Sequence, residues 1–253
     1  MENINDFLEL PKSCYIHTKM PKKVFTDNPE FNLKKEEKTI LKEEIESIYF
    51  EYSLKPALLN IPKYEDEIVR YEEIEILKVR INNENKYNKV CELLQKYIQY
   101  PIIIIIENKN YIRINAAIKK INKIDSNKLI VDEMIYTDWI NINNISNKEK
   151  LFFKSLSIYR LNNNNMLNVY EGYLNCIRSL IVAKYKKLFE VKTIEETLQE
   201  NSIINKICEL ENQIQVLKNQ IKKETNISRK IELNIKINTF KKEIQSIKEK
   251  IYI

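Results

Sequence analysis

Hydrophobic and polar residues alternate, or form short apolar runs, in five segments of the first 145 residues. Segments 48–54, 72–81, 111–115 and 129–139 are rich in β-branched and aromatic residues, which is typical of strands. Segment 102–106 is a continuous run of isoleucines. We expect this run to be a central strand that is covered on both faces.

Two segments between these strands, 34–47 and 86–99, have apolar residues at helical spacing. Pro101 ends the second helix, and residues 108–110 are expected to form the turn of a hairpin. Together, the elements predict an α+β domain over residues 1–145, in which helices flank a mixed sheet.

The chain becomes helical in character after residue 145. Segments 148–160 and 166–189 have apolar residues at helical spacing, and residues 192–199 are expected to form a linker. We therefore predict a helical linker region over residues 146–200.

The sharpest periodicity lies in residues 201–253, which we expect to form a coiled-coil helical hairpin. Six apolar residues follow at intervals of four and three, as the a and d positions of a coiled coil do. They are Ile203, Ile207, Leu210, Ile214, Leu217 and Ile221. The register breaks at residues 224–226, and a second apolar stripe follows. Its members are Ile227, Ile231, Ile237, Phe240, Ile244, Ile247 and Ile251.

Two seams with a break between them predict an antiparallel hairpin. One long helix that pairs in a dimer is the alternative. Asn234 falls in the second seam, where a polar side chain can fix the register. The predicted interface residues are Ile207, Leu210, Ile214, Leu217, Ile221 and Asn234.

The basic charge of the chain is concentrated at its C-terminal end. The formal net charge is +6, and residues 201–253 contribute +5 of it, from 11 Lys and Arg against 6 Asp and Glu. A basic helical arm can follow the phosphates of a nucleic acid. A solvated surface with interspersed charges is the alternative. The candidate nucleic-acid-binding residues are Lys222, Lys223, Arg229, Lys230, Lys241 and Lys242.

The chain contains a single glycine, Gly172. Phosphate-binding loops depend on glycine because their backbone adopts positive φ and approaches the phosphate closely. A P-loop needs two glycines and a dinucleotide-binding turn three, and methyltransferases usually have a glycine-rich turn after the first strand. ATPase, kinase, dehydrogenase and methyltransferase functions are therefore disfavoured, and we expect no cofactor.

The four cysteines, Cys14, Cys91, Cys176 and Cys208, are far apart and form no CxxC pair. We expect free thiols, with neither a zinc site nor a disulfide framework. The single histidine, His17, disfavours a histidine-based metal site, and we expect no metal. Three residues apart on a strand, Cys14 and His17 would face opposite sides. The sequence supplies no third group that would orient His17 as a base.

The composition, with 43% hydrophobic and 31% charged residues, is typical of a globular protein. No apolar run approaches the roughly 18–20 residues of a membrane span. The first residues lack the basic start and apolar stretch of a signal peptide. We therefore expect a cytoplasmic protein that does not contact a membrane.

Four stretches, which together span nearly the whole chain, carry a family resemblance. They are residues 48–56 with 59–61, residues 73–76, residues 100–105 with 117–122 and 137–139, and residues 229–234. In their order and spacing the chain resembles the bacterial domain-of-unknown-function 4391 family. This resemblance includes no catalytic signature, so it transfers no catalytic residue.

Genes of that family tend to lie beside DNA methyltransferase and helicase genes in restriction-type or phage-defence loci. The resemblance therefore implies a non-catalytic accessory subunit of such a system. Its N-terminal domain would dock a partner, and its helical arm would position that partner or touch DNA. The expected partners are DNA methyltransferase and helicase subunits. DNA, and a second copy of the chain paired through the coiled coil, are further candidates.

A metal-dependent nuclease is the first alternative, because the element order over residues 34–106 loosely resembles the core of PD-(D/E)xK nucleases. Such enzymes hold Mg²⁺ with carboxylates and place a lysine near the scissile phosphate. The candidate residues are Glu73, Glu75, Glu107 and Lys109. Two departures weigh against this alternative: the E-x-K follows the second helix, and no aspartate occupies the expected strand.

A purely structural coiled-coil oligomer, indifferent to nucleic acid, is the second alternative. The aromatic residues Tyr49, Phe50, Tyr52 and Trp139 could also form a platform for base stacking. Aromatic residues on strands more often belong to the core, and we assign these four to it.

Overall fold

The structure is a computed structural model that describes residues 7–251. Two compact units make up the chain, Met1–Ile177 and Arg178–Ile253. Each unit has its own arrangement of elements and is described by itself. The predicted three-part division at residues 145 and 200 stays a prediction.

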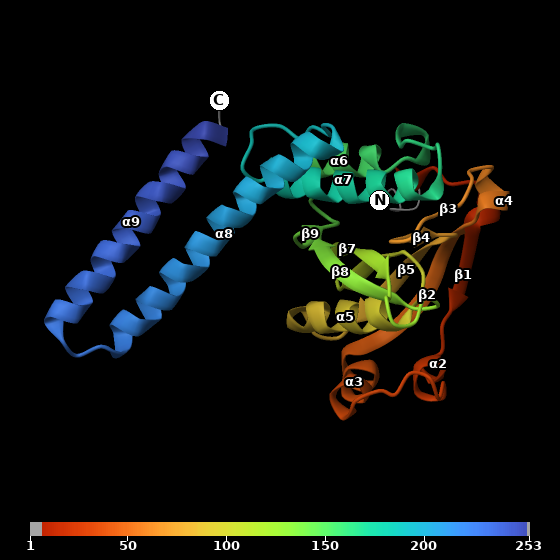
Figure 1. Cartoon of the computed structure of the whole chain (residues 1–253), viewed down its shortest axis with the longest axis horizontal. Helices are drawn as coiled ribbons and strands as arrows, with labels where there is room; N and C mark the ends of the chain where they lie inside the picture. The colour runs from red at the N-terminus through yellow and green to blue at the C-terminus, as the bar shows by residue number, and fades with distance from the viewer. Residues whose placement is uncertain (1–6, 252–253) are drawn as a thin grey trace. The chain divides into compact units, whose positions relative to one another are not determined.

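A seven-stranded mixed sheet forms the centre of the first unit (Figure 1). Its order is β1-β2-β5-β6-β7-β8, and β9 pairs with β7. Strands β5 and β6 are parallel, and the other pairs are antiparallel. The strands are β1 (Tyr15–Lys19), β2 (Ile45–Leu54), β5 (Ile74–Ile81), β6 (Ile102–Asn108), β7 (Tyr111–Ile121), β8 (Leu129–Tyr136) and β9 (Ile140–Asn141). A separate two-stranded sheet consists of β3 (Tyr64–Glu65) and β4 (Arg70–Tyr71).

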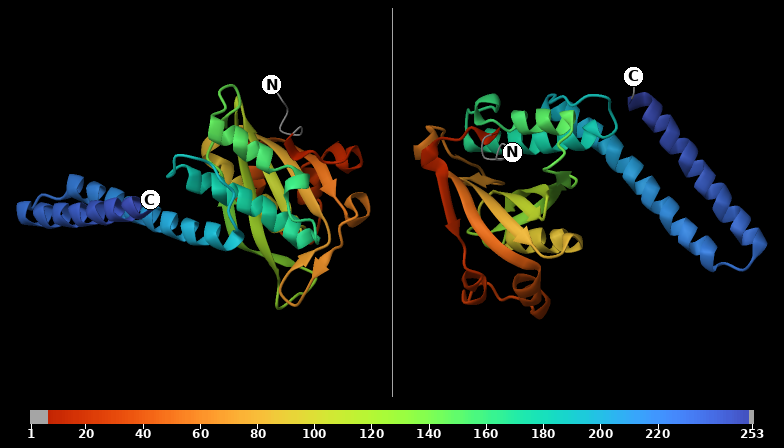
Figure 2. Two further views of the ribbon diagram at one scale, coloured as in Figure 1. Left: turned by 90° about the horizontal axis from the view of Figure 1, so that it is seen from above. Right: turned by 180° about the vertical axis from the view of Figure 1, so that it is seen from behind.

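Helices cover both faces of the large sheet, which confirms the predicted α+β fold. Helix α5 (Tyr87–Tyr97) connects the parallel strands β5 and β6 and lies on one face (Figure 1, Figure 2). Helix α6 (Asn147–Ser155) and the first part of α7 (Met166–Ala183) lie on the other face. The unit also contains the short α-helices α2 (Lys23–Thr26), α3 (Lys35–Thr39) and α4 (Pro56–Leu59).

The predicted central strand is the most buried part of the sheet. All five isoleucines of residues 102–106 are at most 5% exposed. The side chains that point toward α5 pack against its buried face, whose members include Val90, Leu93 and Leu94. Burying a branched side chain of this size contributes roughly 1.5–3 kcal/mol. The isoleucine run therefore anchors the first unit.

Helix α7 is tied to the sheet by Tyr170, which is fully buried. Its hydroxyl accepts a 3.1 Å hydrogen bond from the Ala117 N–H and lies within hydrogen-bond distance of the carbonyls of Ile102 and Ala117. The single glycine, Gly172, belongs to the same helix. A Cβ at Gly172 would lie 3.0 Å from Leu161 Cδ2, so this glycine permits close packing.

The prediction of one helix over residues 34–47 holds as far as residue 44 and is wrong for the last three residues, 45–47. Helix α3 ends at Thr39, one π-helical turn follows over Ile40–Glu44, and β2 begins at Ile45. Ile45 pairs with Ile81 of β5. The apolar residues expected on the helical stripe are buried, but the last two, Ile45 and Ile48, belong to strand β2. A short apolar run fits the helical period of 3.6 residues and the strand period of two equally well.

The linker predicted for residues 192–199 is also wrong. Helix α8 begins at Ile194, where the Thr193 hydroxyl and the Glu196 carboxylate form a capping box. This pattern of Thr followed three residues later by Glu is a signal for a helix start. Helix α7, expected to reach residue 189, ends at Ala183.

The second unit contains the long helices α8 (Ile194–Lys223) and α9 (Ile227–Ile251). The two helices lie side by side and are joined by residues 224–226, where the sequence predicted a break (Figure 1, Figure 2). An ion pair of 2.8 Å between Lys206 and Glu243 bridges them. The supercoiling of this pair stays a prediction. In the part of the chain that the structure describes, no helix combines the length and the apolarity needed to cross a membrane.

On α8 the pairing seam follows the predicted residues closely. Ile207, Leu210 and Ile214 are buried, and Leu217 and Ile221 pack against the same core at its edge. At the start of the seam, Ile204 is buried at 1% exposure, whereas Ile203 is 40% exposed. All these side chains pack within a single chain, and any interface with a second chain stays a prediction.

On α9 the first half of the predicted seam is out of phase. Leu233 is buried, whereas Ile231 is 56% exposed and Asn234 is also exposed. The Asn234 amide donates to the Lys230 carbonyl of its own helix, so it does not fix the register of this helix pair. The actual seam has intervals of four, three, four and three. Its members are Leu233, Ile237, Phe240, Ile244 and Ile247.

Candidate functional site

Glu75 is a buried carboxylate near the start of β5. It is 5% exposed, and its Oε1 accepts a 2.6 Å hydrogen bond from the Ser53 hydroxyl on β2. Its Oε2 has no hydrogen-bond partner. Burial raises the pKa of Glu75 to about 7; the charge of Glu73 adds to this shift, whereas Ser53 and Lys55 oppose it. Glu75 therefore changes its charge near neutral pH.

The structure does not bring the four nuclease candidates together. Glu73 precedes β5, and Lys109 lies exposed in the β6–β7 turn. In the parallel register, Glu75 pairs with Ile102, and Glu107 pairs with a residue five positions further along β5. At about 3.3 Å per residue, these two strand positions are separated by roughly 16 Å. One metal ion could not bind both carboxylates in this geometry.

Glu107 instead belongs to a small ion-pair network on the strands. Its carboxylate lies 2.9 Å from Lys78 Nζ and 3.3 Å from an Arg80 nitrogen. Across residues 7–251, no cluster of three or more His, Cys, Asp or Glu side chains has a geometry that could hold a metal ion. The nuclease alternative thus gains no support from the arrangement of its residues.

His17 has an orienting partner that sequence reasoning missed. Its Nδ1 lies 2.9 Å from Oε2 of Glu51, which is 2% exposed. The imidazole stacks between the rings of Tyr15 and Tyr49, at centroid distances of 5.7 and 5.0 Å. The backbone of His17 adopts a left-handed φ of 44°, which is uncommon outside glycine. A carboxylate at Nδ1 leaves Nε2 available as a base or a ligand.

The thiol of Cys14 does not take part in this arrangement. Cys14 is fully buried, and burial raises the pKa of its thiol. Along residues 7–251, no hydrogen bond joins His17 to a serine, threonine or cysteine hydroxyl or thiol. His17 and Cys14 therefore do not form a nucleophile–base pair. The four cysteines are free thiols.

The aromatic residues considered for base stacking lie in different surroundings. Tyr52 is 6% exposed, and Phe50 and Trp139 pack at the edge of the sheet core. Tyr49 lies half-buried against His17. The four rings do not form one continuous platform, because Trp139 follows β8 whereas the others belong to β2.

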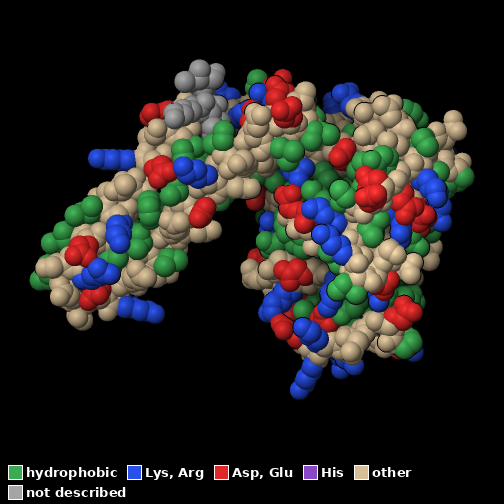
Figure 3. Space-filling view, in the orientation of Figure 1, with side chains coloured by type: hydrophobic (Ala, Val, Ile, Leu, Met, Phe, Trp, Pro, Cys, Tyr) green, Lys and Arg blue, Asp and Glu red, His purple; other side chains and the backbone are tan. Residues whose placement is uncertain are grey.

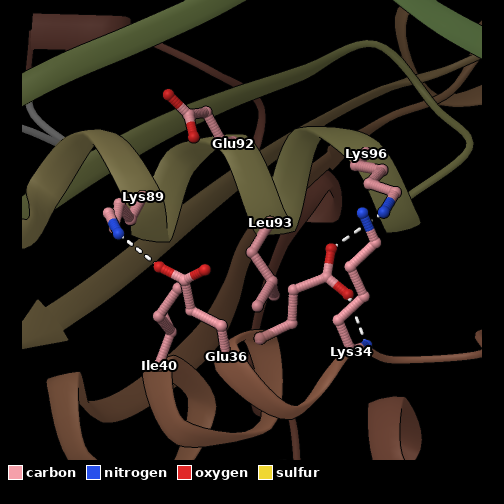
Figure 4. A pocket seen from close by; sticks show the side chains of 8 residues that line it. Lys34, Glu36, Ile40, Lys89, Glu92, Leu93 and Lys96 are labelled. Carbon is pink, nitrogen blue, oxygen red and sulfur yellow. Dashed lines mark hydrogen bonds and ion pairs between the residues drawn. The ribbon is translucent and has the colours of Figure 1, made fainter.

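A pocket of about 340 Å³ lies between α3 and α5 (Figure 4). Its charged side chains pair with one another across the two helices: Glu36 with Lys89, and Glu37 with Lys96. Glu37 also accepts a hydrogen bond from the Tyr97 hydroxyl. These pairs join the two helices across the pocket, so most of its charged groups already have partners within the chain.

The candidate nucleic-acid-binding residues lie on the α8–α9 pair. Four of the six flank its turn: Lys222 and Lys223 end α8, and Arg229 and Lys230 belong to the first turns of α9. Arg229 forms an ion pair with Glu232 at 2.6 Å. Lys241 and Lys242 lie further along α9 and are exposed. The structure thus gathers four of these cations at one end of the helix pair.

These observations define the protein as an α+β domain that continues into a pair of long helices. The chain belongs to the family described as a domain of unknown function, DUF4391, whose model matches residues 8–244. No curated protein and no solved structure matches the chain.

Proposed function

We propose that this protein is a non-catalytic accessory subunit of a DNA methyltransferase/helicase-type restriction or anti-phage defence system in the cytoplasm. It acts by contacts with a partner subunit and with DNA. The observation that carries the proposal is the turn segment of the second unit, residues 218–236, which combines exposed isoleucines with a basic excess. The gene neighbourhood typical of the family supports the same function.

The isoleucines of the turn segment form a stripe that the helix pair does not use. Ile227, Ile231 and Ile235 are 74%, 56% and 61% exposed, and they recur at intervals of four residues on α9. The buried residues of α9 lie elsewhere on the helix, at Leu233 and Ile237. Hydrophobic side chains are visible on the surface of the helix pair (Figure 3). A contiguous exposed apolar stripe on a charged helix is typical of a protein-binding surface.

The basic excess of the turn segment favours an acidic partner. Residues 218–236 contain six Lys and Arg (Lys218, Lys222, Lys223, Arg229, Lys230 and Lys236) and two glutamates, a net charge of +4. Such a charge density attracts the DNA backbone and makes binding dependent on salt. In our proposal the isoleucine stripe docks the partner enzyme, and the neighbouring cations contact DNA.

The test is affinity purification of the tagged full-length chain from its native host, at low and at high salt. We expect the wild type to retain a DNA methyltransferase or helicase subunit. The double variant Ile227→Glu/Ile231→Glu should lose that subunit, because two charges are placed in the apolar contact. The control is Ile124→Glu, at a position that is 96% exposed in the first unit.

Recovery of neither enzyme, together with no DNA retention at low salt, would contradict the proposal. An oligomer that forms without nucleic acid at both salt concentrations would favour the structural alternative. Mg²⁺- or Mn²⁺-dependent cleavage of DNA or RNA would favour the nuclease, and Glu75→Gln should then abolish it.

A further inference from the structure

Arg113 occupies an aromatic enclosure in the first unit that the proposed function does not use. It lies on β7 and pairs across the sheet with Ile106. Its guanidinium carbon lies 3.8 Å from the ring centroid of Tyr87, 5.6 Å from that of Tyr136 and 5.9 Å from that of Trp139. The three rings come from the start of α5, from β8 and from the segment after β8. They hold the guanidinium plane by cation–π contact.

The cation in this enclosure forms no ion pair in the part of the chain that the structure describes. Arg113 is half-buried, its Nε is buried without a hydrogen-bond partner, and no carboxylate of residues 7–251 forms an ion pair with it. Burial lowers the pKa of Arg113, but an arginine keeps its charge in proteins. The Arg113 side chain is hydrogen-bonded to Tyr87, but no carboxylate of the described residues balances its charge, so the site favours a bound anion.

The surroundings of Arg113 favour an anion further. Tyr87 is the first residue of α5, so the ring nearest to the guanidinium belongs to the N-terminal turn of this helix. The first turn of α5 contains no acidic residue. The rings of Tyr87, Tyr136 and Trp139 are only partly buried. The site therefore offers a fixed cation together with partly exposed aromatic surface.

We propose that the Arg113 cluster binds single-stranded nucleic acid, with a phosphate on the guanidinium and a base stacked on the exposed part of Trp139. Arginine binds phosphate with a planar, bidentate edge, and bases stack on aromatic rings irrespective of sequence. A carboxylate ligand would use the same cation but would gain little from the three rings. The proposal is independent of the turn segment of the second unit.

The test uses the intrinsic fluorescence of Trp139, the only tryptophan of the chain. The full-length protein is titrated with a short oligothymidylate, with inorganic phosphate and with acetate. We expect the oligonucleotide to quench Trp139 with saturation at low salt, and the affinity to fall as salt rises. Arg113→Met should weaken this binding about tenfold or more, and Arg113→Lys should weaken it less, because it keeps the charge but loses the planar edge.

Two controls separate this site from other effects. Arg160→Met removes an exposed arginine of the same unit and should leave the titration unchanged. Replacing Lys222, Lys223, Arg229 and Lys230 by glutamine should also leave the quenching of Trp139 unchanged, even where it weakens total DNA binding. Circular dichroism confirms that each variant is folded.

Three results would overturn the inference. One is an oligonucleotide that does not change Trp139 fluorescence. Another is quenching that persists at full strength in Arg113→Met. The third is equal affinity for phosphate, acetate and the oligonucleotide, which would identify the cluster as a general anion site without stacking.

Discussion

Glu75 and Lys119 are two buried ionisable residues of the sheet, and burial moves the pKa of both to about 7. Burial raises the pKa of Glu75 and lowers that of Lys119, because it disfavours the charged form of each. Lys119 is 2% exposed, and its Nζ donates 2.7 Å hydrogen bonds to the carbonyls of Ile98 and Tyr100. A neutral amine still has two hydrogens for these two acceptors, so Lys119 can lose its charge without leaving either unpaired.

The first prediction concerns Glu75. The pKa of Glu75 is higher in the folded state than in the unfolded state, so the folded state binds this proton more tightly. The free energy of unfolding is therefore highest below about pH 4.5, and it falls as the pH rises from 4.5 through about 7. The difference in pKa corresponds to about 3 kcal/mol. Glu75→Gln should remove this pH dependence and exceed the wild type in stability at pH 8, as measured by urea unfolding. Glu72→Gln, at an exposed site, is the control. An unchanged pH profile in Glu75→Gln would refute the assignment.

The second prediction concerns Lys119, for which the sign is opposite. Its pKa is lower in the folded state, so stability rises as the pH increases from about 7 to about 10.5, by about 5 kcal/mol. Lys119→Met should abolish this rise, although it also costs about 1–3 kcal/mol by leaving two carbonyls unpaired. Urea unfolding between pH 7 and 10 measures the slope. Lys120→Met, at an exposed ion pair with Asp132, should keep the slope of the wild type.

The clusters at His17 and Arg113 could not be predicted from the sequence. Glu51 lies 34 residues from His17 in the sequence. The register of β2 against β5 shifts between Phe50 and Tyr52, on either side of Glu51, and no local sequence pattern predicts this shift. The rings around Arg113 come from three separate segments. Only the pairing of β7 with β8 and β9, and the position of α5, bring them together. The residue type of Trp139 predicts a core position, and only the fold shows that its ring is partly exposed at the edge of the core.

At the scale of elements, the predicted helices and strands that hold are those whose segment length and residue types fit only one kind of element. The run Ile102–Ile106 and the hairpin after it are strands in the structure because β-branched residues and a two-residue turn leave few alternatives. The segment 34–47 begins as a helix and ends as the start of strand β2. Its four apolar residues are too few to distinguish the helical period from the strand period. The phase of α9 was missed because isoleucine occupies both its seam and its exposed stripe.

The third prediction tests the phase of α9. Leu233→Ala should destabilise the second unit by about 2–5 kcal/mol, because it removes buried methyl groups and leaves a cavity. Ile231→Ala, at an exposed position two residues away, should change stability by less than about 0.5 kcal/mol. Urea unfolding followed by circular dichroism measures both. If Ile231→Ala lowered the free energy of unfolding more than Leu233→Ala, the seam would instead pass through Ile231.

At the scale of the whole molecule, the division into two units has a thermodynamic consequence. Residues up to Ile177 contain the sheet and its core, whereas residues from Arg178 contain a separate core formed by the end of α7, α8 and α9. Units with separate cores can unfold in separate steps. The division lies inside α7, which is one continuous helix in the structure, so no loop or change of composition could mark it in the sequence.

The fourth prediction is that destabilising one unit leaves the other folded. Leu233→Ala should increase hydrogen exchange throughout α8 and α9 but leave the amides of β5, β6 and β7 protected. Ile104→Ala, which removes a fully buried side chain of the sheet core, should do the reverse. Hydrogen exchange measured by mass spectrometry resolves the two regions in the full-length chain. If either variant accelerated exchange equally in both regions, the chain would unfold as one cooperative body, and the α8–α9 pair could not open while the sheet stays intact.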